Sequence, residues 1–159
     1  MRERMEASRP ERDLKRGFGG IVDVEFLVQL LQLKYGGANA ALRFPNTWQA
    51  LEVLAEAGML TPNESSTLKD GYDFLRLVES RLRIVHNRSL DELPEDPDDL
   101  EKLARRLGCA ATAETSAGTR FLGDLERHTT QIRELFLRLV RREGEMKAKS
   151  KVKSQKSKK

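Results

Sequence analysis

Apolar residues in this chain recur at intervals of three and four, and that spacing restricts the fold more than any other feature. The interval places side chains on one face of an α-helix and not on one face of a β-strand. It is found in the ranges 21–35, 47–57, 62–87, 97–107 and 113–142, and no segment shows the alternation typical of a strand. We therefore expect an all-α fold, an antiparallel bundle of about five helices.

Capping residues and glycines mark the expected helix ends. Thr61-Pro62-Asn63-Glu64 has the pattern of a capping box with proline at the first helical position. Asp96-Pro97 is a similar start, Asn46 or Thr47 can cap the second helix, and Gly36 is one of the glycines expected to end a helix. Leu33 widens the apolar seam of the first helix, which predicts that this helix is nearly surrounded by protein. Gly71 lies inside the third range and predicts a close crossing with another helix.

The formal net charge of +4 comes from the C-terminal end of the chain. Residues 144–159 hold seven Lys and one Glu, a balance of +6, so residues 1–143 carry −2. This basic tail has little to bury, and we expect it to be disordered. The expected organisation is a charged segment over 1–16, a helical bundle over 17–143 and a disordered Lys-rich tail over 144–159. Nucleic-acid binding through the tail is the weakest functional alternative, because the bundle itself is close to neutral.

The apolar, cysteine and histidine content of the chain restricts its location and the kinds of site it can form. No run of 18 apolar residues and no secretory signal is present, so we expect neither a membrane span nor export. Cys109 is the single cysteine, which fits a reducing compartment and a cytoplasmic location. His128 lies in the apolar seam of the last helix, and a packed, hydrogen-bonded histidine is a better interpretation than a catalytic base. We predict no metal site in this chain.

The segment from Lys15 to Phe26 is the most unusual local sequence. Its three glycines precede a helix, where exposed backbone N–H groups can hold a phosphate and Lys15 can add a charge. Against this, glycines that permit a turn and close packing explain the same pattern. The candidate phosphate-proximal or site-facing residues are Lys15, Gly17, Gly19, Gly20, Asp23 and Glu25.

The two acidic residues of this segment, Asp23 and Glu25, can each have a structural role or a role in a site. Asp23 lies in the first helical turn, where a carboxylate stabilises the helix dipole without any catalytic role. Glu25 lies in a strongly apolar helix, so it either pairs with an arginine of another helix or faces a site. Farther on, Arg76, Glu79 and Arg83 are spaced so that they can form structural ion pairs along one helix face.

The glycine segment resembles a signature of the glutamine synthetase adenylyltransferases, which are similar to PII uridylyltransferases. The matching residues run from Lys15 through Gly17, Gly19-Gly20-Ile21, Asp23-Val24-Glu25-Phe26 and Gln29. A block from Tyr72 to Leu82 and the final helix around His128 support the resemblance, which covers about 11–140. The chain resembles the helical domain that follows the catalytic palm in these enzymes.

The resemblance implies an enzyme that transfers AMP from ATP to a tyrosine of glutamine synthetase, with Mg²⁺. The palm and its catalytic carboxylates should precede Lys15, so this chain is expected to be a fragment without catalytic residues or bound cofactors of its own. Its expected partners are the upstream palm and glutamine synthetase, and PII protein is a further candidate. The Lys-rich end favours the later, adenylylating module. The alternative is a free-standing helical module that binds a protein and catalyses nothing.

Overall fold

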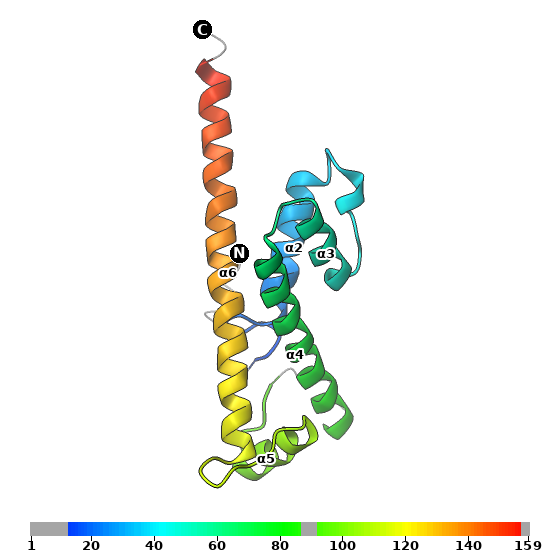
Figure 1. Ribbon diagram of the computed structural model, residues 1–159, viewed down its shortest axis with the longest axis vertical. Helices are drawn as coiled ribbons and strands as arrows, with labels where there is room; N and C mark the ends of the chain where they lie inside the picture. The colour runs from blue at the N-terminus through cyan, green and yellow to red at the C-terminus, as the bar shows by residue number, and fades with distance from the viewer. Residues whose placement is uncertain (1–12, 87–91, 157–159) are drawn as a thin grey trace.

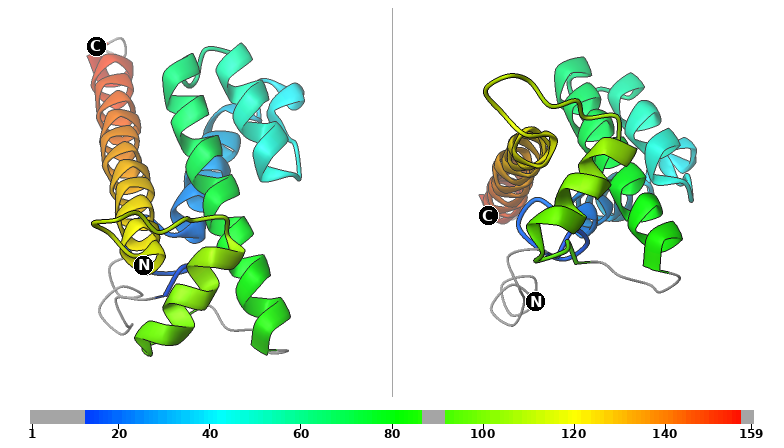
Figure 2. Two further views of the ribbon diagram at one scale, coloured as in Figure 1. Left: turned by 60° about the horizontal axis from the view of Figure 1, so that its bottom comes forward. Right: turned by 90° about the horizontal axis from the view of Figure 1, so that it is seen from below.

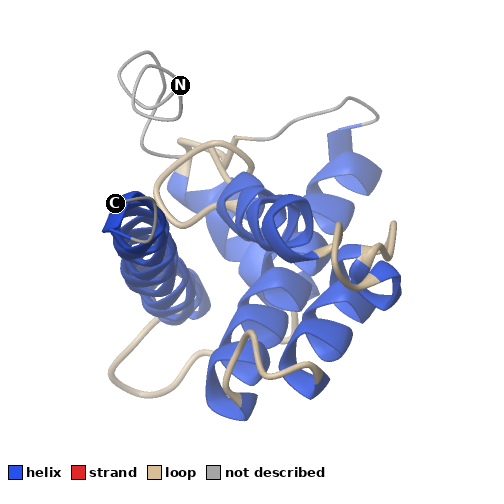
Figure 3. Ribbon diagram, turned by 90° about the horizontal axis from the view of Figure 1, so that it is seen from above, coloured by secondary structure: helices blue, strands red, loops and turns tan. Residues whose placement is uncertain are grey.

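The computed structural model describes residues 13–86 and 92–156, and over these ranges the protein is helical. Figure 1 shows how the helices of this part of the chain are arranged, and Figure 3 shows helices and loops in the described residues and no strand. The only pairing of strand type among the described residues is a single antiparallel bridge between Asp13 and Glu92. The all-α fold predicted from the sequence is confirmed. The elements in order are α2 (Ile21–Tyr35), the 3-10 helix η1 (Ala40–Leu42), α3 (Thr47–Glu56), α4 (Pro62–His86), α5 (Pro97–Arg106) and α6 (Ala117–Lys156).

The capping signals in the sequence act as predicted. The side chain of Asn46 accepts a hydrogen bond from Gln49 N–H at the start of α3, and Asp96 accepts from two backbone N–H groups at the start of α5. At the start of α4 the capping box closes in both directions. Thr61 N–H donates to Glu64 Oε2 at 2.9 Å, and Glu64 N–H donates to Thr61 Oγ1 at 3.2 Å. These bonds satisfy N–H groups that have no partner inside the helix.

The helices form a bundle in which α6 runs beside both α2 and α4 (Figure 2). α3 and α4 run in opposite directions, and α5 lies across the end where α4 finishes and α6 begins (Figure 1). One core joins all of them. Its largest fully buried side chains include Phe121, Ile21, Leu27, Leu51, Leu75 and Ile132. No helix in the described ranges combines the length and the apolar character needed to cross a membrane.

Gly71 of α4 lies directly against the Ile132 side chain of α6. A Cβ built on this glycine would lie 2.7 Å from Ile132 Cδ1. The predicted close crossing is therefore present, and the missing side chain makes room for it.

One expectation from the sequence was wrong in part. Leu33 is 85% exposed, so α2 is open on one side instead of nearly surrounded. The last helix begins at Ala117 and extends to Lys156. Residues 145–156 contain neither glycine nor proline and are mostly good helix formers. Of the charged segment 1–16, residues 1–12 lie outside the described ranges.

Candidate functional site

The turn over residues 13–20 is closed by its own hydrogen bonds. The side chain of Asp13 accepts from Lys15 N–H at 2.9 Å and from Arg16 N–H at 2.8 Å. Each amide from Gly19 to Asp23, as well as that of Gly17, also donates within the chain. These N–H groups are consequently already bonded, and the turn does not present them as a cradle for a phosphate.

Close packing explains the three glycines of this turn. Gly19 has a φ of +62°, and a Cβ on it would overlap the backbone carbonyl of Thr129 in α6. A Cβ on Gly20 would lie 2.7 Å from the carbonyl oxygen of Leu14, and one on Gly17 would overlap the carbonyl of Asp13. Side chains at these positions are sterically excluded. The geometry therefore supports the packing interpretation of the motif.

Asp23 fixes this turn to the last helix. Its carboxylate is completely buried and accepts a hydrogen bond from Gly19 N–H at 3.0 Å. Arg133 Nη1 lies 3.5 Å from the same oxygen, and the Arg133 guanidinium lies 4.6 Å from the ring centroid of Phe18. Asp23 thus points toward α6, so it is a structural residue of the α2–α6 contact.

Glu25 points away from Asp23, toward α4, as their spacing on a helix predicts. Its carboxylate is half-buried, and the Tyr72 hydroxyl lies 3.5 Å from Oε1, which is long for a hydrogen bond. Among the described residues Glu25 forms no ion pair. Of the two interpretations offered by the sequence, pairing with an arginine of another helix is therefore not what the structure shows.

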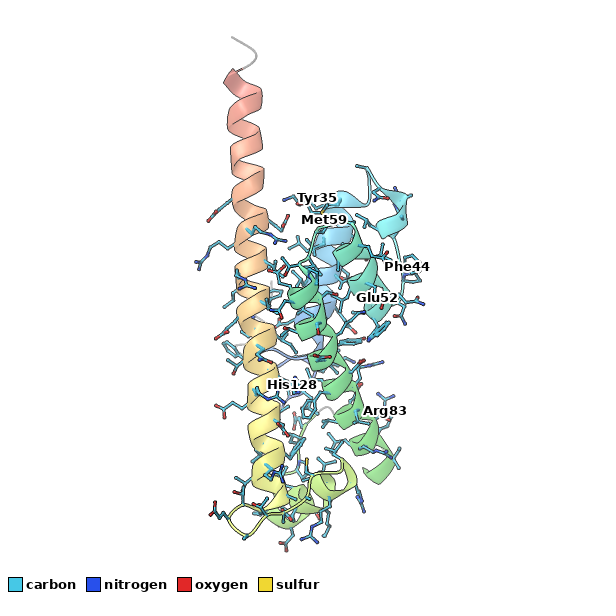
Figure 4. All side chains as sticks on the ribbon, in the orientation of Figure 1. Tyr35, Phe44, Glu52, Met59, Arg83 and His128 are labelled. Atoms are coloured by element: carbon cyan, nitrogen blue, oxygen red, sulfur yellow. The ribbon has the colours of Figure 1, made fainter. Side chains whose placement is uncertain are left out.

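Arg76 and Arg83 of α4 are arginines of another helix, but both form ion pairs with Glu79 and not with Glu25. Arg76 Nη1 lies 2.8 Å from Glu79 Oε2, and Arg83 Nη2 lies 3.2 Å from Oε1. Glu79 is buried, while both arginine side chains are about half exposed or more. The arrangement is an ion-pair ladder within α4, and Arg83 lies on the outer side of that helix in Figure 4.

The polar residues that follow Glu25 on α2 have different roles. Gln32 Nε2 donates to the carbonyls of Leu42 and Phe44, at 2.9 and 2.7 Å, and so holds the loop after α2. Gln29 is exposed and lines an open, mainly apolar groove of about 530 Å³ beside Leu33 and Phe44. Glu25 and Gln29 are therefore the polar residues of this stripe that remain on the surface.

His128 differs from its prediction in one respect. Its ring is stacked on Phe74, with 4.5 Å between centroids, but Nδ1 is buried and has no hydrogen-bond partner among the described residues. Burial, and secondarily the charge of Arg127, lower the pKa of this imidazole. The ring packs against α4 at Gly71, where a built Cβ would lie 3.8 Å from Nδ1.

In the described part of the chain, neither Cys109 nor the acidic residues form another reactive or metal-binding site. Burial raises the pKa of the Cys109 thiol, which opposes formation of a reactive thiolate. Within residues 13–86 and 92–156, no group of three or more His, Cys, Asp or Glu side chains is placed to hold a metal ion.

An ion-pair cluster at the other end of α2 was not predicted from the sequence. There the buried Glu143 of α6 binds Lys34 and Tyr35, and Glu64 faces Arg138 and Arg142. These partners are separated by 74 to 109 residues, so spacing along one helix cannot reveal them.

Comparison with known proteins adds the family. The sequence model of the GlnD PII-uridylyltransferase family matches residues 1–140. Bifunctional glutamine synthetase adenylyltransferase/adenylyl-removing enzymes of Streptomyces avermitilis, Streptomyces coelicolor and Rhizobium meliloti are 40%, 39% and 38% identical to this chain. The matches cover 89%, 83% and 84% of this chain, but 14%, 13% and 14% of the relatives. The chain thus spans about a seventh of the length of these relatives.

Proposed function

This chain belongs to the GlnD PII-uridylyltransferase family, and we propose that it is the helical part of an enzyme that adenylylates glutamine synthetase. The observation that supports this most is the 40% identity, over 146 residues, to the Streptomyces avermitilis bifunctional enzyme. The names of the curated relatives favour glutamine synthetase over PII as the protein substrate. The proposed setting is the cytoplasm, which the single cysteine suggests.

The proposed reaction transfers AMP from ATP to a tyrosine of glutamine synthetase and uses Mg²⁺. The described residues do not fit a Mg²⁺ site, because they lack a cluster of ligating side chains. We therefore assign no step of the transfer to this chain, and the transfer chemistry falls to the part of the enzyme that this chain does not cover. We expect the isolated chain to transfer no AMP.

We assign to this chain a polar edge formed by Glu25 and Gln29 of α2 with Tyr72 and Arg76 of α4. Arg76 lies over the Tyr72 ring, 5.9 Å from its centroid, and Tyr72 in turn contacts Glu25. Glu25 has no ion-pair partner among the described residues, although it lies on a strongly apolar helix. A carboxylate and an amide left at the surface there fit an edge that faces the nucleotidyl-transfer part of the enzyme.

A graft tests this function. The 159-residue chain replaces its matching segment in the Streptomyces avermitilis relative, and a second version deletes that segment. We expect the graft, with ATP and Mg²⁺, to add AMP to glutamine synthetase, as measured by intact-protein mass, and we expect the deletion to be inactive. A folded graft that is as inactive as the deletion would contradict the proposal.

A further inference from the structure

The open groove of about 530 Å³ lies between the last turns of α2 and residues 43–45, and we call it the α2 groove. Leu33, Phe44 and Pro45 line it, and Leu33 and Phe44 are 85% and 40% exposed. Figure 4 shows Phe44 on the side of the bundle away from α6. Single exposed apolar residues are ordinary on a protein surface, but apolar side chains that share one hollow mark a place where another surface packs.

Hydrogen bonds hold the α2 groove in shape. Gln32 of α2 donates to the carbonyls of Leu42 and Phe44 and so fixes the segment that follows η1. Arg43 Nε donates to the carbonyl of Gly36 at 2.8 Å. A Cβ on Gly36 would lie 3.3 Å from Arg43 Cγ, so the glycine makes room for the arginine. The groove is therefore formed before anything binds, and a preformed site loses less entropy on binding.

Arg43 is the one charged residue among those that line the α2 groove. It is exposed, and within residues 13–86 and 92–156 it forms no ion pair. Its bond from Nε orients the guanidinium group, while the N–H groups of both Nη atoms remain for another acceptor. Carboxylates and phosphates match this fork geometry. The groove is consequently suited to an anionic group beside an apolar one.

The lining and shape of the α2 groove favour a carboxylate on a polypeptide. The groove lies at the C-terminal end of α2, where the helix dipole disfavours negative charge, and a phosphate carries more of it than a carboxylate does. Small-molecule sites enclose most of their ligand, whereas this groove is open. An apolar lining with one arginine is complementary to a polypeptide segment in which a large apolar side chain lies next to Asp or Glu.

We propose that the α2 groove docks such a segment of a partner protein. The apolar side chain of the segment packs against Leu33 and Phe44, and its carboxylate pairs with Arg43. An apolar anchor in a groove, oriented by one charged contact, is a recurrent mode of peptide recognition. The proposal goes beyond AMP transfer, because docking requires neither ATP nor the rest of the enzyme. A second copy of the chain and a nucleotide are the competing occupants.

Selection of a displayed library of random peptides on the 159-residue chain tests the proposal. Enriched peptides should share a large apolar residue with Asp or Glu close to it in sequence. The most enriched peptide, made synthetically, should bind about tenfold more weakly to Leu33→Ser, which removes an apolar contact. Ile84→Ser is the control, because Ile84 is 70% exposed but belongs to α4, and it should not change binding. No enrichment, or equal binding by Leu33→Ser, would overturn the proposal.

Replacing the acidic residue of that peptide by its amide tests the contact with Arg43. Binding to the wild-type chain should weaken about tenfold, and binding to Arg43→Gln should hardly change with the same replacement. Arg81→Gln, at an exposed position of α4, should behave like the wild type. Because the change is made in the peptide, a variant that fails to fold cannot hide the result. An amide that binds the wild-type chain as well as the acid does would overturn the proposal.

The competing occupants give different results. A wild-type chain that sediments as a dimer and is dissociated by Leu33→Ser would assign the α2 groove to a second copy. Displacement of the bound peptide by ATP would assign it to a nucleotide. Either result would overturn the proposal, whereas a monomer whose peptide is not displaced by ATP would support it. None of these measurements depends on AMP transfer, so failure of the proposed function would be seen separately in the graft.

Discussion

The Tyr35 hydroxyl donates a 2.6 Å hydrogen bond to the Glu143 carboxylate and so joins the end of α2 to α6. Lys34 Nζ lies 2.6 Å from the same oxygen, and Arg142 Nε donates to the other oxygen at 3.1 Å. Arg142 also donates to the carbonyl of Met59, between α3 and α4, and Tyr35 and Met59 are both labelled in Figure 4. One buried carboxylate therefore connects three parts of the bundle.

Glu143→Ala should lower the free energy of unfolding by about 2 kcal/mol, because it leaves the Tyr35 hydroxyl and the Lys34 ammonium without their shared acceptor. Partial exposure of Lys34 and Arg142 keeps the loss below that of a fully buried pair. Urea unfolding measures the change, and Glu145→Ala is the matched control because Glu145 is exposed on the same helix. Equal losses for the two variants would show that the cluster contributes nothing.

Stability should fall in acid in a way that depends on Glu143. Burial alone would raise the pKa of this carboxyl, but hydrogen bonds from Lys34, Tyr35 and Arg142 outweigh burial and lower the pKa. Because the folded pKa is depressed, the stabilisation is complete above the unfolded value of about 4.3 and is lost as pH falls through the folded value. The difference in thermal midpoint between wild type and Glu143→Gln should therefore be constant near neutrality and shrink in acid. A difference that grows below about pH 4 would have the wrong sign.

Gly19→Ala should destabilise the protein by about 3 kcal/mol, since it places a Cβ at positive φ and against the Thr129 carbonyl. The control is Gly37→Ala, where the built Cβ meets nothing within 4 Å. Thermal unfolding of both variants provides the comparison. If Gly19→Ala is as stable as Gly37→Ala, the glycine turn is not held against α6.

Gly71→Ala should cost about 1 kcal/mol, although alanine is the better helix former, because its Cβ meets Ile132 Cδ1. Adding Ile132→Val removes that methyl group and should recover part of the loss. Gly123→Ala, on the open side of α6, should instead be neutral or slightly stabilising. Chemical denaturation measures the free energy of unfolding of the double variant. If Ile132→Val recovers none of the lost stability, positions 71 and 132 are not in contact.

Local signals predicted most of the fold. Asn46, the Thr61–Glu64 box and Asp96 set helix starts in the structure because a cap acts within three residues of sequence. The start of α6 was placed four residues too early, because the helix is capped by Ser116, whose hydroxyl accepts a hydrogen bond from Thr119 N–H at 3.1 Å. The exposure of Leu33 was missed because apolar periodicity shows which residues are apolar and not which neighbours cover them.

The roles of the candidate site residues were harder to predict from the sequence than the helices were. The motif identified the segment from Lys15 to Glu25, but its glycines serve packing and Asp23 serves the contact with α6. The partner of Asp23, Arg133, is 110 residues away, and no pattern within one helix indicates it. Glu25 remains a candidate site-facing residue, because Arg76 and Arg83 bind Glu79 instead of Glu25.

We propose that this chain serves AMP transfer through the Glu25 edge of α2. Glu25→Gln is introduced into the isolated chain, where urea unfolding is measured, and into the graft, where the turnover of glutamine synthetase adenylylation is measured. The isolated chain should change by less than about 0.5 kcal/mol, and turnover of the graft should fall by about tenfold or more, which is about 1.4 kcal/mol of transition-state stabilisation. Glu56→Gln, on the exposed side of α3, is the control and should affect neither quantity. A loss of about 3 kcal/mol in the isolated chain, or unchanged turnover in an active graft, would contradict the account.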